Sequence, residues 1–236
     1  MKTLRRYVDR YYTYGLLILF LLVWVWSVWN PASGANWILE NKMVVFFIPV
    51  IYLLLIRYIQ FSKLSLTLVT LFISLHVVGA HYNYGSVPFG YTLSSLTGDT
   101  GGNMYDKLVH FSFGFLIIYP IREFFLRVGS MKGFWGYFVP FTMLMAMAAM
   151  YEMFEWVTVL QYPNDVAYLF IGGNDPFDTT KDLFVAMIGG ILTLIIVALL
   201  EWVDRRDKFW KAIKKSFFRD RRDSPAEDRI LHKDLI

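Results

Sequence analysis

The sequence predicts an all-α protein, a polytopic membrane bundle of six transmembrane helices with both termini in the cytoplasm. The chain of 236 residues is 56% hydrophobic and only 18% charged, whereas soluble domains carry about a quarter charged residues. Uncharged runs such as residues 16–30, 43–56 and 183–200 reach, with their flanks, the roughly 20 apolar residues that cross a bilayer. Basic residues alternate between crowded and nearly empty connections, which indicates an even number of crossings.

The predicted spans follow one another through short connections. The first ends at the turn-forming segment Asn30-Pro31-Ala32-Ser33-Gly34, and the fourth ends before Val128-Gly129-Ser130. The second and the sixth contain the uncharged runs 43–56 and 183–200. We expect the spans at residues 11–30, 42–60, 63–82, 104–126, 133–157 and 179–203, with bounds that are accurate to a few residues. Together they form one bundle over residues 1–203.

The first span also resembles a cleavable signal peptide, because a basic start and an apolar stretch precede Ala32-Ser33-Gly34-Ala35. However, Trp24, Trp26 and Trp29 stand just before that cleavage site. Aromatic residues at such a position are typical of the interfacial belt of a retained helix. We therefore interpret the first span as retained.

The basic residues also set the orientation. Of 23 Lys and Arg residues, only Lys42, Lys107 and Lys181 fall on the side predicted to be outside. The positive-inside rule then places both termini in the cytoplasm, with the protein in the cytoplasmic membrane and the lipid bilayer as its main partner. The net charge of +4 does not indicate nucleic-acid binding, because the basic residues lack an aromatic stacking surface or a recognisable module.

The residues after the sixth span predict a helix on the membrane surface. Phe209, Ile213 and Phe217 recur every four residues among Lys and Arg, as in a basic amphipathic helix that binds the anionic lipids of the inner leaflet. An ordinary stop-transfer flank would explain the charges but not the aromatic spacing. We assign residues 204–222 to this helix and residues 223–236 to a polar, disordered tail.

Ionisable residues gather at span ends that the topology places on the outer side. Such residues are costly in a membrane and are therefore candidates for function. Spacings of three or four residues put Asp106 and His110 on one helix face, and Glu152 and Glu155 on another. Gly189-Gly190 would allow a neighbouring helix to approach the sixth span closely. The candidate set is His81, Asp106, His110, Glu152, Glu155, Asp178 and Asp182.

Two imidazoles and five carboxylates at this spacing are suited to one or two divalent metal ions. Zn²⁺ accepts His and carboxylate ligands, while Mn²⁺, Mg²⁺ and Ca²⁺ favour carboxylate-rich sites. Without a cation or protonation, so many neighbouring carboxylates would repel one another. Because the chain has no cysteine, disulfides and thiolate metal sites are excluded.

Simpler roles stay open for single carboxylates in this set. Asp106 and Asp178 stand where helices begin, a position that suits an N-cap. Glu152 and Glu155 could instead face water at a helix end.

The remaining ionisable residues near the set have two interpretations each. Lys107 and Lys181 each adjoin a candidate ligand, and they could bind an anionic substrate group or balance the local carboxylates. His76 lies deeper in the third span and off the face of His81, so we expect it to pack against neighbouring helices rather than to join the set.

Four segments carry a resemblance to a known family: Gly79-Ala80-His81-Tyr82, Tyr105-Asp106-Lys107-Leu108-Val109-His110-Phe111, Tyr151-Glu152-Met153-Phe154-Glu155-Trp156 and Asp178-Thr179-Thr180-Lys181-Asp182. Together they resemble the YjdF family of bacterial inner-membrane proteins over about residues 10–200. The resemblance implies a helical inner-membrane protein but no particular activity.

A more distant similarity is to VanZ-like proteins, which are associated with glycopeptide resistance and the cell envelope. It is carried by Asp106-Lys107-x-x-His110, the Glu152/Glu155 pair, and Asp182 followed by Gly189-Gly190. The chain departs from that pattern by having Glu155 where a glutamine is usual, and His81 on an earlier span. The similarity implies an envelope context rather than a resistance role.

The leading hypothesis is a metal-dependent membrane hydrolase or transferase that acts at the outer face on a lipid-linked or envelope substrate. A bound cation would polarise an ester or phosphoryl oxygen and activate water. Glu152 or Glu155 would serve as general base, and His110 as ligand or acid. The alternatives are a non-catalytic protein that binds or transports an ion or small solute, and a structural bundle with capped helix ends. Against transport, the inner halves of the spans offer few polar residues.

Overall fold

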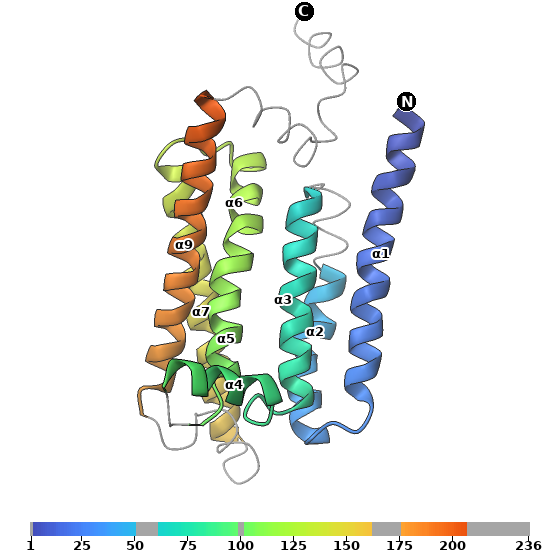
Figure 1. Ribbon diagram of the computed structural model, residues 1–236, viewed down its shortest axis with the longest axis vertical. Coiled ribbons are helices and arrows are strands. Elements are labelled where there is room, and N and C mark those ends of the chain that lie inside the picture. The colour runs from blue at the N-terminus through green and yellow to red at the C-terminus, as the bar shows by residue number, and fades with distance from the viewer. Residues whose placement is uncertain (1, 51–60, 99–101, 162–175, 207–236) are drawn as a thin grey trace, which may run out of the picture.

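The computed structural model describes residues 2–50, 61–98, 102–161 and 176–206. Within these residues every regular element is a helix and none is a strand, which confirms the predicted all-α class. The long helices stand side by side as a bundle, and the short α4 lies across one end (Figure 1). The elements are α1 (Lys2–Val28), α2 (Gly34–Val50), α3 (Lys63–His81), α4 (Pro88–Thr97), α5 (Tyr105–Ser112), the π-helix η2 (Phe113–Ile117), α6 (Ile118–Arg127), α7 (Trp135–Gln161) and α9 (Asp178–Arg206).

Five segments of the described chain are long and apolar enough to cross a membrane: Tyr11–Val28, Lys63–His81, Tyr105–Arg127, Trp135–Thr158 and Asp178–Val203. They agree with the first, third, fourth, fifth and sixth predicted spans. The second predicted span, 42–60, falls partly on residues 51–60, outside the described residues, and α2 begins earlier than predicted, at Gly34. The helix predicted at 204–222 and the tail at 223–236 lie almost wholly outside the described residues. The number of spans and their orientation stay predictions.

The helices define two ends of the bundle, which we call upper and lower as drawn in Figure 1. α1, α3 and α7 run from the upper to the lower end, whereas α5 and α9 begin at the lower end (Figure 1). The candidate residues stand where α3 and α7 end and where α5 and α9 begin. Chain direction alone therefore brings most of them to the lower end, at similar depth.

The sequence analysis did not predict α4, the short helix at the lower end. Pro88 occupies its first turn, where the missing N–H of proline costs nothing. Gly98 ends it in the left-handed conformation, with a φ of 73°. Asn103 then joins α4 to α5, because its side chain donates to the Val87 carbonyl at 2.7 Å and accepts from the Tyr105 N–H at 2.9 Å. These contacts fix the start of α5, which carries the first candidate residues.

The closest helix crossing in the described chain joins the fourth span to α9. A Cβ added to Gly114 would lie 1.9 Å from the Ala186 carbonyl oxygen. A Cβ added to Gly189 would lie 2.3 Å from the Phe111 carbonyl oxygen. The two backbones are thus in contact, which only glycine permits on both sides. The crossing fixes the rotation of α5 relative to α9 just above the candidate residues.

The π-helix η2 lies at this crossing and changes the backbone hydrogen bonds of the fourth span. A π turn pairs each N–H with the carbonyl five residues earlier, so the regular i to i+4 pattern is broken there. The hydroxyl of Thr193 on α9 donates to the Phe115 carbonyl at 2.7 Å. This side chain replaces part of the helical bonding that the π turn disturbs.

We therefore expect Thr193→Val to lower the free energy of unfolding by about 1 kcal/mol, since the Phe115 carbonyl would lose a donor inside the bundle. Thr193→Ser keeps the hydroxyl and should stay within about 0.5 kcal/mol of the wild type. Thermal unfolding in a neutral detergent measures both variants. A larger loss in Thr193→Ser than in Thr193→Val would show that the methyl group, not the hydrogen bond, matters.

Candidate functional site

The first candidate residues come from two helix starts and one helix end at the lower end of the bundle. Asp106 and His110 stand four residues apart in α5, so both project from the same face. Glu152 lies in α7 near its lower end, and Asp182 lies in the second turn of α9. α5 and α9 pack together next to the crossing described above, and α7 packs against α9. His110 is only 7% exposed.

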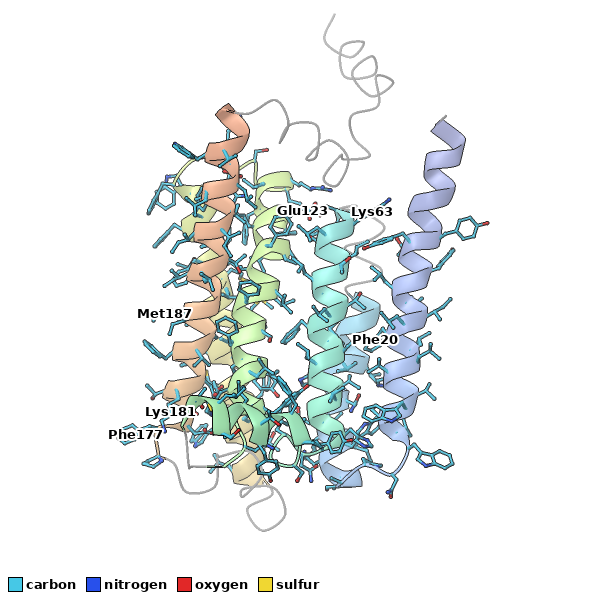
Figure 2. The ribbon with its side chains drawn as sticks, viewed as in Figure 1. Phe20, Lys63, Glu123, Phe177, Lys181 and Met187 are labelled. Atoms are coloured by element: carbon cyan, nitrogen blue, oxygen red, sulfur yellow. The ribbon has the colours of Figure 1, made fainter. Side chains whose placement is uncertain are left out.

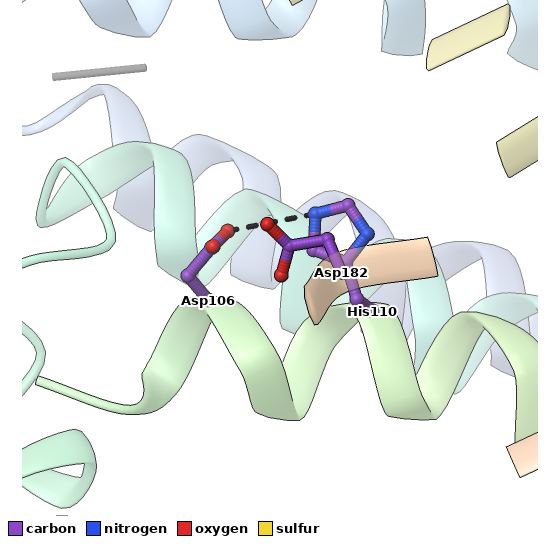
Figure 3. A group of neighbouring side chains, drawn as sticks. All are labelled: Asp106, His110 and Asp182. Atoms are coloured by element: carbon purple, nitrogen blue, oxygen red, sulfur yellow. Dashed lines mark ion pairs between the residues drawn. The ribbon is translucent and has the colours of Figure 1, made fainter. Parts of the chain in front are cut away.

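His110 is the centre of the cluster. Its Nε2 lies 3.7 Å from Asp106 Oδ1 and 3.6 Å from Glu152 Oε1. Two groups have ligand atoms within 4.8 Å of one another: Asp106, His110 and Asp182 (Figure 3), and His110, Glu152 and Glu155. Because Nε2 faces carboxylates of both groups, a cation bound to this nitrogen could take its other ligands from either. We call these five residues the His110 cluster.

Lys107 is the positive charge next to the His110 cluster. Its Nζ lies 3.1 Å from Asp106 Oδ2 and 2.8 Å from the Asp182 carboxylate, and it also contacts Asp178. Of the two roles open to Lys107, the structure therefore has it balancing carboxylates. Asp178 joins the site through this lysine and belongs to neither group around His110. Lys181 is an exposed residue of α9 at the lower end (Figure 2).

One carboxylate oxygen in the His110 cluster, Glu152 Oε1, is buried without a hydrogen-bond partner among the described residues. The buried Asp182 Oδ1, by contrast, is paired with Lys107 Nζ at 2.8 Å. The two residues are 5% and 2% exposed. A buried acceptor that lacks a donor costs about 1–3 kcal/mol, and more if it is charged. A proton, or a cation bound to His110 Nε2, which lies 3.6 Å away, would satisfy Glu152 Oε1.

The structure places His81 away from this cluster. Its Nδ1 lies 3.0 Å from the Ser27 carbonyl oxygen, and its ring packs on Trp26 at 4.4 Å between ring centroids. Both partners belong to α1, so the last turn of α3 points His81 toward that helix. The position of His81 at the end of the third span suggested a metal ligand. However, His81 lies on the face of α3 that packs against α1.

A neighbouring polar group was missed by the sequence analysis. Glu40 of α2 is 4% exposed, and its Oε2 accepts from the Tyr151 hydroxyl at 3.1 Å and lies 3.8 Å from His76 Nε2. The Tyr84 hydroxyl is 2.7 Å from His76 Nδ1. His76, expected only to pack, is thus held by a glutamate and a tyrosine.

Tyr151 connects this group to the His110 cluster. Its ring stands edge-on to His76, with 6.4 Å between centroids, and edge-on to His110, with 6.0 Å. Its hydroxyl is anchored by Glu40. The signal that could have revealed Glu40 is a lone carboxylate beside an apolar span, which is unusual in a membrane protein.

The chain is similar to bacterial inner-membrane proteins. Residues 12–202 match a family described as "Predicted membrane protein (DUF2238)". The inner membrane protein YjdF of Escherichia coli (strain K12) is 29% identical over 178 residues, which cover 75% of this chain and 84% of that protein. The resemblance to the YjdF family that the sequence predicts is thereby confirmed. No solved structure matches the chain. Since the family match includes every helix of the bundle and the whole His110 cluster, this protein is an integral membrane protein of the DUF2238 family.

Proposed function

We propose that the protein is a metal-dependent membrane hydrolase or transferase whose centre is the His110 cluster. The observation that carries this proposal is the buried Glu152 Oε1, which accepts no hydrogen bond among the described residues and lies 3.6 Å from His110 Nε2. One imidazole with several carboxylates is a donor set that Zn²⁺ or Mn²⁺ accepts, and Mg²⁺ or Ca²⁺ would use the carboxylates.

The residues have distinct roles in this proposal. His110 would hold the cation either with Asp106 and Asp182 or with Glu152, and the cation would supply a Lewis acid for an ester or phosphoryl oxygen. Glu155 belongs to the same group of possible ligands as His110 and Glu152. Its side chain is less buried than that of Glu152, so it is better placed to take a proton from water as general base. Lys107 keeps the neighbouring aspartates neutralised. The substrate class is a lipid-linked or envelope molecule, because the cluster lies at the end of a membrane bundle.

We also propose that the lower end faces the outside and that the chain crosses the membrane six times. α1 ends at the lower end and α3 begins at the upper end (Figure 1), and we assign the crossing between them to the segment that begins with α2. The basic residues favour the upper end as the cytoplasmic one.

A pair of reporter fusions measures this topology. A fluorescent protein that folds only in the cytoplasm should be bright when fused to the C-terminus, and alkaline phosphatase there should be inactive. The opposite pattern would overturn the orientation and the outer location of the His110 cluster together.

A transport role has less support from the packing. Apart from the Glu40, His76 and Tyr151 group described above, buried apolar side chains pack between the described helices. These side chains are Phe20, Val44, Val77, Ile117, Ile118 and Leu144.

Metal analysis of protein purified in mild detergent tests the centre directly. The wild type should carry about one divalent ion per chain, and His110→Ala should carry none. His81→Ala is the matched control, because it removes an equally buried histidine at the same end that contacts α1 instead. Loss of metal from both variants, or from neither, would contradict the assignment of His110 as the ligand.

A chelator should lower the thermal stability of the wild type and of His81→Ala but leave that of His110→Ala unchanged. A ligand that binds only the folded state at 100 times its Kd stabilises it by about 2.7 kcal/mol. Identical melting curves with and without chelator in the wild type, together with no stoichiometric metal, would favour a structural role for these carboxylates.

A further inference from the structure

A second polar cluster lies at the upper end of the bundle, where α3 begins and α6 ends (Figure 2). It surrounds a cavity of about 140 Å³. The lining residues are Ser62, Tyr119, Arg122, Glu123, Leu126 and Arg127. None of them takes part in the proposed function, and the apolar middle of the bundle separates them from the His110 cluster.

Arg122 is fixed at the wall of this cavity. It is 7% exposed, and its Nη2 donates to Glu201 of α9 at 3.0 Å. Its guanidinium carbon lies 4.4 Å from the centre of the Tyr137 ring, and the Tyr137 hydroxyl donates to the same glutamate at 2.5 Å. These partners hold the Arg122 side chain at the cavity wall.

Arg127 is fixed by Glu123, one turn earlier on the same helix. The Glu123 carboxylate also accepts from the Ser62 N–H at 2.8 Å, from the Ser62 hydroxyl at 2.8 Å, and from the Ser65 hydroxyl. With four donors around it, this carboxylate orients Arg127 and the start of α3. It is not an open acceptor for a further cation.

The Nε–H of Arg122 has no hydrogen-bond partner among the described residues, although the atom is buried. A guanidinium presents its donors in a rigid fork, and a buried donor of a charged group is costly when it is left without an acceptor. Phosphate oxygens match this fork two at a time, which is why arginine is the preferred phosphate ligand. One donor of the Arg122 guanidinium, the Nε–H, therefore still lacks an acceptor.

We propose that this cavity binds a phosphate group, supplied either by the head group of an anionic phospholipid or by free phosphate. Arg122 offers the Nε–H that lacks an acceptor, and Arg127, Ser62 and Tyr119 line the same cavity. A cavity of about 140 Å³ has room for several molecules the size of water, each of which takes about 30 Å³ in the liquid. Its position at the end of the helices suits a head group, since basic pockets between transmembrane helices recognise such groups.

Calorimetric titration of the full-length protein in a neutral detergent tests the proposal. The probes are short-chain phosphatidylglycerol, the corresponding diacylglycerol without phosphate, and inorganic phosphate. Saturable binding of phosphatidylglycerol but not of diacylglycerol identifies a lipid head group, whereas binding of inorganic phosphate alone identifies the free ion. Absence of binding by both phosphate-containing probes overturns the proposal.

Three variants locate the site. Arg122→Lys keeps the charge but loses the fork, and it should weaken binding at least about tenfold. Leu126→Phe fills part of the cavity and leaves both arginines unmutated, so it should also reduce binding. This variant remains informative if Arg122→Lys folds poorly. Lys132→Gln removes an exposed charge between α6 and α7 and should bind as the wild type does. Wild-type affinity in both cavity variants would overturn the assignment.

Discussion

Lys107→Met is expected to lower the free energy of unfolding by about 3–5 kcal/mol. The Nζ of Lys107 contacts the carboxylates of Asp106, Asp178 and Asp182, and the Asp182 side chain is only 2% exposed. Methionine preserves most of the apolar stem but leaves three aspartates without their common counter-ion. Breaking a buried ion pair from one side is costly because the remaining charges stay desolvated and repel one another. Reversible unfolding in detergent measures the loss.

Lys42→Met is the matched control for this prediction. Lys42 is also a lysine on the side predicted to be outside, but it is exposed, so its replacement should change stability by less than about 0.5 kcal/mol. Adding Asp182→Asn to Lys107→Met should recover part of the loss, because one uncompensated charge is removed. Equal stability of the two methionine variants would mean that the aspartates do not depend on Lys107.

Gly114→Ala is expected to destabilise the protein by about 3 kcal/mol, the upper part of the usual range for overpacking. The new Cβ would lie 1.9 Å from the Ala186 carbonyl oxygen and 2.8 Å from the Gly190 nitrogen. Both are backbone atoms, so the clash is relieved only if the fourth span moves away from α9. That movement would separate Asp106 and His110 from Asp182, and metal affinity should fall together with stability.

Gly15→Ala provides the control for the same chemical change. Gly15 lies in α1, and a Cβ added there meets no atom within 4 Å among the described residues. Since alanine favours a helix over glycine by up to about 1 kcal/mol, this variant should be as stable as the wild type or slightly more stable. If Gly114→Ala melts at the same temperature as Gly15→Ala, the crossing is looser than the structure shows.

The spans were predictable because a bilayer imposes constraints that can be read along the chain. A helix must be about 20 apolar residues long to cross the hydrocarbon core, and five predicted spans agree closely with described helices. The depth of the candidate residues followed from the same reasoning, since alternate helices run in opposite directions. This was enough to bring Asp106, Glu152 and Asp182 to one end.

Rotation of the helices about their own axes was not predictable from these patterns. His81 and His76 lie on one helix, five residues apart, and only the packing shows that His81 faces α1 while His76 faces Glu40. The position of α4 was missed for a related reason. Its ten residues are too few to span a membrane, so span length gives no signal for it.

The sequence by itself determined the helical class, the approximate bounds of the described spans and the set of ionisable residues at one end. Only the tertiary structure decided which of these residues meet. Hydropathy depends on how many apolar residues follow one another, whereas contact depends on which face each helix turns inward. That choice is made where Gly114 and Gly189 bring the fourth span against α9, because backbone contact at glycine allows a single rotation and register. Asp106, His110 and Asp182 come together as a consequence of that crossing.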